Sequence, residues 1–413
     1  MPTFFVWTIA GTSISLMLLR PKRSSEALWV SIGALVLVLS RLIPLKGAVS
    51  AIRMGVDVYL FLAGMMLLAE LARHAGVFDW MADIAAQLAK GSSARLFLLV
   101  YLVGVVVTAF LSNDATAVVL TPAVLAAVRR AEVEPRPHLL ACAFIANAAS
   151  FILPISNPAN LVVYGPHLPA LFDWLRTFWL PSLLSIVSTF FCLRWLTRAS
   201  LRSPVPNHRV RISLTSEGRF ALAGLLFAAA ILLTASALGL PLGLPAFMAG
   251  MLALLLVSLR NRQALAAVVR GVSWSVLPLV AGLFVIVEAL NEAGLLEAAR
   301  LGLSRLALTS AWLVRLGSGF CVSLLSNLMN NLPVGLASGA ALQQNGAYGP
   351  LAHAVLLGVD LGPNLSVTGS LATILWLIAL RRENVEITAW QFFEVGVIVM
   401  PVALLLAILG CGH

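Results

Sequence analysis

Two carboxyl residues lie at the edges of long apolar runs and are the first candidates for chemistry. Asp114 follows a charge-free run over 96–113, and Asp360 separates the charge-free runs 316–359 and 361–380. A carboxylate deep in a bilayer costs about 2.5–3.5 kcal/mol on insertion scales, so it persists where it binds an ion, relays a proton or pairs with a cation. We expect both residues to carry a coupling proton. The alternative is a structural carboxylate that caps the half-helix beginning beside it.

Amide and hydroxyl side chains interrupt the apolar runs in four clusters, over 112–116, 147–160, 326–333 and 360–373. Gly and Pro in and around these clusters break helices and leave backbone groups unpaired. Such backbone is tolerated at membrane depth only where it lines a cavity or is buried in protein. The clusters therefore predict one central site, although a single Asn or Ser in a membrane helix more often joins neighbouring helices. The predicted substrate-binding residues are Asn113, Thr116, Asn147, Asn157, Asn330, Asn331, Thr368 and Ser370.

The composition decides the class of protein that must position these residues. Of the 413 residues, 60% are hydrophobic and 11% are charged, whereas a soluble domain carries about 25% charged residues. The formal net charge of +10 does not indicate nucleic-acid binding, because the basic residues are scattered between apolar runs and form no stripe with aromatic residues. The sequence predicts an all-α polytopic membrane protein.

The apolar runs predict about ten transmembrane helices and two re-entrant hairpins around Asn113 and Asn330. The expected spans are 3–19, 26–43, 55–72, 138–170, 176–196, 219–238, 245–259, 270–290, 352–380 and 392–410. Five spans per half is an odd number, so the two halves would be inverted relative to each other. With both termini outside and the central linker cytoplasmic, most Lys and Arg residues lie inside, as the positive-inside rule requires of a bacterial inner-membrane protein.

The two halves resemble each other in sequence. Residues 63–76 align with 281–294 and share Ala, Gly and Glu residues at equivalent positions. The order of polar breaks also recurs, since Asn113-Asp114 matches Asn330-Asn331 and Asn147 matches Asp360. Inverted-topology repeats with helices broken at mid-membrane are typical of secondary transporters. The predicted units are a first repeat (1–196), a basic cytoplasmic linker (197–218) and a second repeat (219–413).

No motif of an enzyme, a metal site or a nucleotide site is visible. The chain has no GxSxG, HExxH or Walker motif, and its four cysteines show no CxxC spacing. We therefore expect no enzymatic activity, no metal and no cofactor. A polytopic membrane enzyme and a passive channel remain the alternatives from other classes; a channel would conduct without a coupling carboxylate.

The fourth cluster resembles a known family. Asp360-Leu-Gly-Pro, followed by Gly369-Ser-Leu-Ala-Thr373 and Leu375-Trp376, is similar to the late signature of the arsenite/antimonite efflux permeases of the ion transporter superfamily. Further similar motifs are Asn330-Asn-Leu-Pro333, Asn113-Asp114, Thr121-Pro122 and Ser156-Asn157 with Asn160. The resemblance covers roughly 26–410. Asn147 departs from it, because these permeases are expected to have Asp there, and this shifts the expected proton carriers to Asp114 and Asp360.

The resemblance implies a secondary transporter that exports arsenite and antimonite in exchange for protons. Arsenite at neutral pH is chiefly the uncharged trihydroxide, whose hydroxyls suit amide and hydroxyl side chains and need no fixed cation. A thiol cage would hold it too tightly for release. The alternative within the superfamily is a sodium/proton antiporter or an organic-anion carrier of the dicarboxylate type. The implied partners are the lipid bilayer, a second copy in a homodimer and a soluble ATPase subunit, but no nucleic acid.

Overall fold

The computed structural model describes residues 2–21, 24–202, 213–259, 261–294, 310–344 and 346–411. This part of the chain is helical and contains no strand. A bilayer offers no partners to backbone N–H and C=O groups, so spanning segments fold as helices that satisfy these groups internally. Among the described helices, six are long and apolar enough to cross a membrane, or up to seven if one bent pair counts as a span. The chain is a multi-pass membrane protein, as its composition predicts.

The helices follow the predicted spans closely. The first half contains α1 (Pro2–Leu19), α2 (Glu26–Leu39), α3 (Leu45–Met54), α4 (Val56–His74), α5 (Val77–Leu88), α6 (Ser93–Phe110), the π-helix η2 (Ala115–Leu120), α7 (Thr121–Arg130), α8 (Pro135–Ala148), α9 (Pro158–Tyr164) and α10 (Leu171–Leu196). The second half contains α11 (Ser216–Ala237), α12 (Gly243–Ser258), α13 (Arg262–Gly271), α14 (Val276–Glu292), α16 (Ala311–Met329), α17 (Asn331–Gln344), α18 (Pro350–Leu361), α19 (Leu371–Arg382) and α20 (Ala389–Gly410). The short helices α3 and α13 are not among the predicted spans, because charged residues interrupt their apolar runs.

Two of the predicted spans are broken, as the polar clusters predict. The span over 138–170 divides into α8 and α9, and the span over 352–380 divides into α18 and α19. Asn147 and Asp360 each occupy the last position but one of the first segment, in agreement with the alignment of the two halves. The second segments begin at equivalent N-caps, Asn157 and Ser370. Each predicted half therefore contains one broken helix.

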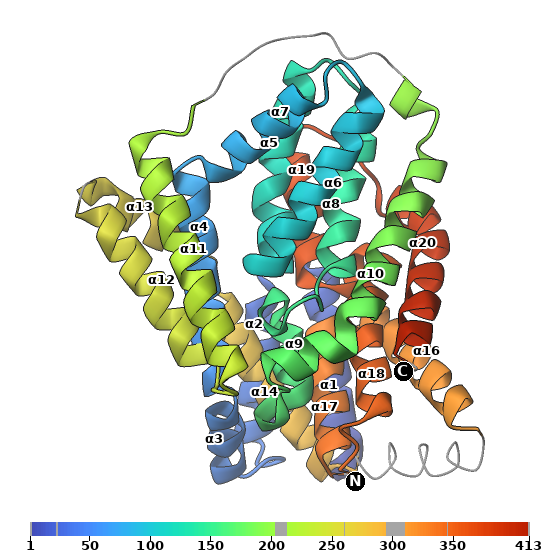
Figure 1. Cartoon of the computed structure of the whole chain (residues 1–413). Helices are drawn as coiled ribbons and strands as arrows, with labels where there is room; N and C mark the ends of the chain where they lie inside the picture. Colours follow the sequence, from blue (N-terminus) through green and yellow to red (C-terminus); the bar gives the residue numbers. More distant parts are fainter. Residues whose placement is uncertain are drawn as a thin grey trace.

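Each hairpin approaches the middle of the molecule from a different end (Figure 1). Helices α6 and α7 contact α5, and all three reach the end of the molecule opposite the two termini. Helices α16 and α17 contact each other and lie toward the end that holds the termini. Opposite ends are what two inverted repeats require. Residues 203–212 of the linker lie outside the described part of the chain, so the boundaries of the two predicted halves stay a prediction.

Small residues allow the helices around the centre to pack closely. A Cβ built on Gly64 of α4 would lie 2.3 Å from the backbone carbonyl of Ala246 in α12, and one on Gly358 of α18 would lie 2.3 Å from the carbonyl oxygen of Gly319 in α16. Membrane helices associate through such small residues because lipid gives no hydrophobic drive between them. Helix α8 lies in the centre and is buried on every side from Pro137 to Ala148, which is typical of a core helix.

Candidate functional site

The turns of the two hairpins are held by strained residues. Ser112 has a φ of 150° and Asn330 a φ of 75°, a region that residues with a side chain rarely adopt. Each side chain accepts a hydrogen bond from the helix that follows it: Ser112 Oγ from the Ala115 amide at 3.2 Å and Asn330 Oδ1 from the Leu332 amide at 3.4 Å. Backbone strain persists only where the surroundings enforce it, and it gathers at functional sites. Both predicted hairpin tips therefore combine a positive φ with a side chain that accepts a hydrogen bond from the following helix.

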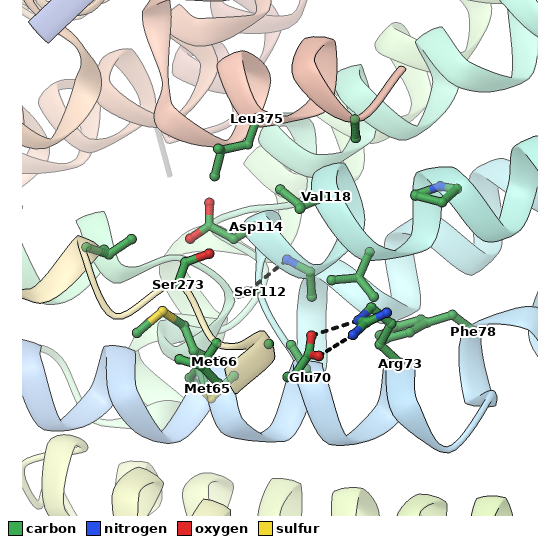
Figure 2. A pocket seen from close by; sticks show the side chains of 18 of the residues that line it. Met65, Met66, Glu70, Arg73, Phe78, Ser112, Asp114, Val118, Ser273 and Leu375 are labelled. Atoms are coloured by element: carbon green, nitrogen blue, oxygen red, sulfur yellow. Dashed lines mark hydrogen bonds and ion pairs between the residues drawn. The ribbon is translucent and has the colours of Figure 1, made fainter. Parts of the chain in front are cut away.

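Asp114, which follows the first tip, faces a cavity of about 630 Å³ (Figure 2). The first half contributes α4, α5, η2 and α7 to its walls, and the second half contributes the α13–α14 connection and α19. Figure 2 shows the Asp114 carboxyl and the Ser273 hydroxyl facing each other across the cavity, with Met66 below them. A water molecule in the liquid takes about 30 Å³, so the cavity can admit a small hydrated solute to a carboxyl group between the halves.

The π-helix η2 begins directly after Asp114. Pro122 stands at the start of α7 and has no N–H to give to the preceding turn, and single π-turns of this kind are frequent at functional sites. Thr116 in η2 is buried and lies 2.8 Å from the Thr108 hydroxyl of α6. Thr116 therefore joins the two arms of the hairpin and is not among the residues that line the cavity.

Carboxyl groups outnumber cations around the cavity. The charged lining residues are Glu70, Arg73, Asp79, Asp114, Arg382 and Glu383. Arg73 makes a bidentate ion pair with Glu70 (Figure 2), and Arg129 of α7 pairs with Glu383 beyond α19 at 3.4 Å. With all six lining groups ionised, four carboxylates face two guanidinium groups. In that state the lining has a formal charge of −2, which Arg129 reduces to −1 by pairing with Glu383, and one of the two lining cations, Arg73, is paired with Glu70.

Asp360 lies away from this cavity in a buried polar network that joins the two halves. Its side chain is inaccessible to solvent. Oδ1 accepts a hydrogen bond from Asn157 Nδ2 at 2.9 Å, and Oδ2 lies 2.7 Å from Ser150 Oγ. Both partners belong to the break between α8 and α9, whereas Asp360 ends α18. The predicted residues Asn157 and Asp360, distant in sequence, are therefore in direct contact.

A second pair of amides continues the network. Asn147 Nδ2 donates to Asn364 Oδ1 at 3.0 Å, and Asn364 Nδ2 donates to the Phe144 carbonyl at 3.1 Å. Asn157 also caps α9, because its Oδ1 accepts the Ala159 amide at 3.0 Å. Buried polar groups are costly unless they are hydrogen-bonded. These bonds thus support the unwound backbone of both broken helices at the same depth.

The remaining predicted residues serve mainly the local backbone. Asn113 accepts the Asp114 amide at 2.9 Å, and Thr368 donates to the Asn327 carbonyl at 2.8 Å. Ser370 caps α19 by accepting the Thr373 amide at 3.1 Å, and Asn331 is buried at the start of α17. The structure therefore brings together Asn147, Asn157 and Asp360, and places Asp114 in a separate chamber. Residues that the sequence analysis did not single out are Ser150, Asn364, Ser273 and the Glu70–Arg73 pair.

Comparison with known proteins places this arrangement in a family. The model of a family described as "Citrate transporter" (CitMHS) matches residues 14–358. The chain belongs to this family. The "Arsenical pump membrane protein" of Escherichia coli K12 is 29% identical over 356 residues, which cover 82% of each chain, and that of Yersinia enterocolitica is 27% identical over 353 residues, which also cover 82% of each. The resemblance to arsenite permeases is thus confirmed, and the protein is a membrane carrier and not an enzyme.

A solved structure supports the fold. The transporter YdaH of Alcanivorax borkumensis has a TM-score of 0.56 to this chain, at 15% identity, and the match covers 100% of this chain and 97% of that one. That transporter is described as having an unusual topology. At this identity the similarity concerns the fold alone. This CitMHS member therefore shares its overall fold with that transporter.

Proposed function

We propose that this CitMHS member exports arsenite and antimonite across the bacterial inner membrane in exchange for protons, with both termini outside and the linker in the cytoplasm. Asp114 is the proton carrier that the cavity exposes, and Asp360 is the buried one. The substrate enters from the cavity. The arsenical pump membrane proteins among its relatives support this choice of substrate.

The proposal rests on the excess of carboxyl groups over guanidinium groups in the cavity lining. Four carboxyl residues and two guanidinium residues line it, and Arg73 is engaged by Glu70. A citrate anion would meet an excess of like charge in the lining, which disfavours its binding. The arsenite trihydroxide is neutral, so its hydroxyls form hydrogen bonds without such a penalty. The same carboxylates attract protons, which favours proton exchange.

Two residues that line the cavity directly follow predicted substrate residues in the chain. Pro158 and Leu371 line the cavity, and the preceding residues in the chain are Asn157 and Ser370, the N-caps of α9 and α19. Two half-helices therefore begin beside the cavity, and the first amides of a helix are partly unpaired donors. Those donors belong to α19, because Pro158 has no N–H and the Ala159 amide is bound to Asn157 Oδ1. Arsenite oxygens suit these donors, and its hydroxyl protons suit Asp114.

The test uses everted membrane vesicles that contain the protein. We expect arsenite uptake that requires an imposed pH gradient and collapses with a protonophore. Asp114→Asn should abolish gradient-driven uptake while leaving exchange of labelled for unlabelled arsenite. The matched control is Asp173→Asn, which removes an exposed carboxyl at the start of α10, outside the cavity, and should leave both activities unchanged.

Citrate transport is the second candidate, because the family model carries that description. The same vesicles would then take up citrate, and arsenite would neither be transported nor compete. That result would overturn the proposed substrate. Uptake driven by a sodium gradient and indifferent to the protonophore would overturn the proposed coupling ion instead.

A further inference from the structure

Ser150 stands between two acceptors and has one proton to give. Its Oγ lies 2.7 Å from Asp360 Oδ2 and also 2.7 Å from the backbone carbonyl of Asn147. A serine hydroxyl donates one hydrogen bond and accepts up to two. When Asp360 is ionised, its oxygens only accept, so the single Ser150 hydroxyl proton goes either to Asp360 Oδ2 or to the Asn147 carbonyl, which also accepts the Ser150 amide at 3.2 Å. The Ser150 hydroxyl can therefore point to only one of its two acceptors at a time.

A nearby amide oxygen also lacks a donor. Asn147 Oδ1 is buried and has no hydrogen-bond partner among the described residues, although Asn147 Nδ2 is bound to Asn364. An unsatisfied buried acceptor costs about 1–3 kcal/mol. The break at the end of α8 is therefore rich in acceptors, and addition of one proton to Asp360 frees the Ser150 hydroxyl to donate there.

We propose that Ser150 is a positioning residue that couples protonation of Asp360 to the break between α8 and α9. On protonation, the proton adds to Asp360 Oδ2, the new O–H donates to Ser150 Oγ, and the Ser150 hydroxyl turns to the Asn147 carbonyl. No bond between heavy atoms forms or breaks. The inference deepens the proposed function, since it rests on proton exchange, but it does not depend on which substrate is carried.

Ser150 and Asn157 are the residues whose hydrogen bonds respond when Asp360 gains this proton. Helix α18 packs against α8, α9, α16, α17 and α20. The titratable residues on these elements and on α18 itself are Arg136, His138, Cys142, Tyr164, Arg315, Cys321, His353 and Glu394. In the described part of the chain, the side chains that hydrogen-bond to Asp360 are Ser150 and Asn157, and none of those titratable groups forms an ion pair with it. A change in its charge is therefore felt first at the α8–α9 break.

The consequence is a link between the two halves. With Asp360 ionised, the Ser150 hydroxyl holds α18 to the α8–α9 break. With Asp360 protonated, the Ser150 hydroxyl gives the Asn147 carbonyl a second hydrogen bond beside that of the Ser150 amide, while Ser150 Oγ accepts from Asp360. Asn157 donates to Oδ1 in both states and also caps α9. One proton thus reverses the direction of the hydrogen bond between α18 and the α8–α9 break.

The test measures the carboxyl directly, by infrared difference spectroscopy of the purified protein in lipid nanodiscs between pH 5 and 9. Asp360→Asn identifies the band of the protonated Asp360 carboxyl. Ser150→Ala should move the midpoint of this band by about one pH unit or more, a tenfold change in proton affinity, and raise its stretching frequency. Ser150→Thr keeps the hydroxyl and should restore both. The matched control is Ser185→Ala, since Ser185 Oγ donates to the Ala148 carbonyl at 3.0 Å and no hydrogen bond joins it to Asp360.

The outcomes separate this inference from the proposed function. An Asp360 band in Ser150→Ala that matches wild type in midpoint and frequency overturns the role of Ser150, even if arsenite uptake remains driven by protons. A band that responds to sodium and not to pH overturns it too. A Ser150-dependent band in a protein that transports no metalloid supports the role of Ser150 and refutes the proposed substrate. Folding of each variant is checked by its thermal unfolding in the same nanodiscs.

Discussion

Asn157 offers a quantitative test of the buried network, because it makes two separable hydrogen bonds. Its amide nitrogen donates to Asp360 at 2.9 Å, and its amide oxygen caps α9 at 3.0 Å. Loss of an N-cap costs about 1 kcal/mol, and loss of a hydrogen bond to a charged group costs about 1.5–3 kcal/mol. Asn157→Ala should therefore lower the free energy of unfolding by about 2.5–4 kcal/mol. Asn157→Ser keeps a capping oxygen but is too short to reach Asp360, and should cost about 1.5–3 kcal/mol.

The chain contains a matched control for this pair of bonds. Asn261 caps α13 by accepting the Gln263 amide at 3.0 Å and donates to Glu217 at 3.1 Å, but near the surface. Exposed carboxylate contacts are worth about 0–1 kcal/mol, so Asn261→Ala should cost about 1–2 kcal/mol in all. The assay is reversible unfolding in mixed detergent micelles, followed by tryptophan fluorescence. Equal losses for Asn157→Ala and Asn261→Ala would refute the argument that burial of Asp360 strengthens the network.

Three further perturbations test the cavity and the packing around it. Asp114→Asn should reduce pH-driven arsenite uptake to background while exchange continues; pumping at the wild-type rate would exclude Asp114 as a carrier. Gly271→Ala places a Cβ 1.8 Å from Glu70 Oε1, so it should displace the Glu70–Arg73 pair and lower uptake at least several-fold, with unfolding measured alongside. Gly64→Ala places a Cβ 2.3 Å from the backbone of α12 and should cost about 1–3 kcal/mol through overpacking, whereas Gly11→Ala, with nothing within 4 Å, should not destabilise the protein in the same unfolding assay.

The fold was predictable because its signals are local. A charge-free run of about 20 residues is stable in a bilayer as a helix, and Gly, Pro and Asn within a run mark where that helix breaks. The boundaries of α1, α10, α11 and α20 fall within a few residues of the predicted spans, apart from the start of α10, which lies five residues earlier. The amphipathic helices α3 and α13 were missed because their charged residues divide the apolar runs. In the structure, α3 and α4 form a bent pair, and α13 lies within a candidate span that continues into α14.

The candidate site was predictable in part. Residue type alone indicated Asp114, Asp360, Asn147 and Asn157, because carboxyl and amide groups are rare and costly inside a membrane. It did not indicate Ser150, since serine is common in membrane helices and usually bonds to its own backbone. Nor did it show that Glu70, near a helix end, meets the α13–α14 connection beside the cavity. That contact joins segments about 200 positions apart.

The sequence by itself therefore determined the class of protein, the helices, their breaks and the rare carboxyl groups, because each of these follows from the cost of polar groups in lipid. Only the tertiary structure decided which polar groups share a chamber. Asp114 and Asp360 are alike in the sequence, yet one faces a cavity between the halves and the other is enclosed by Ser150 and Asn157. The difference arises because the break between α8 and α9 lies against α18 and encloses Asp360. That contact depends on how all the helices pack together.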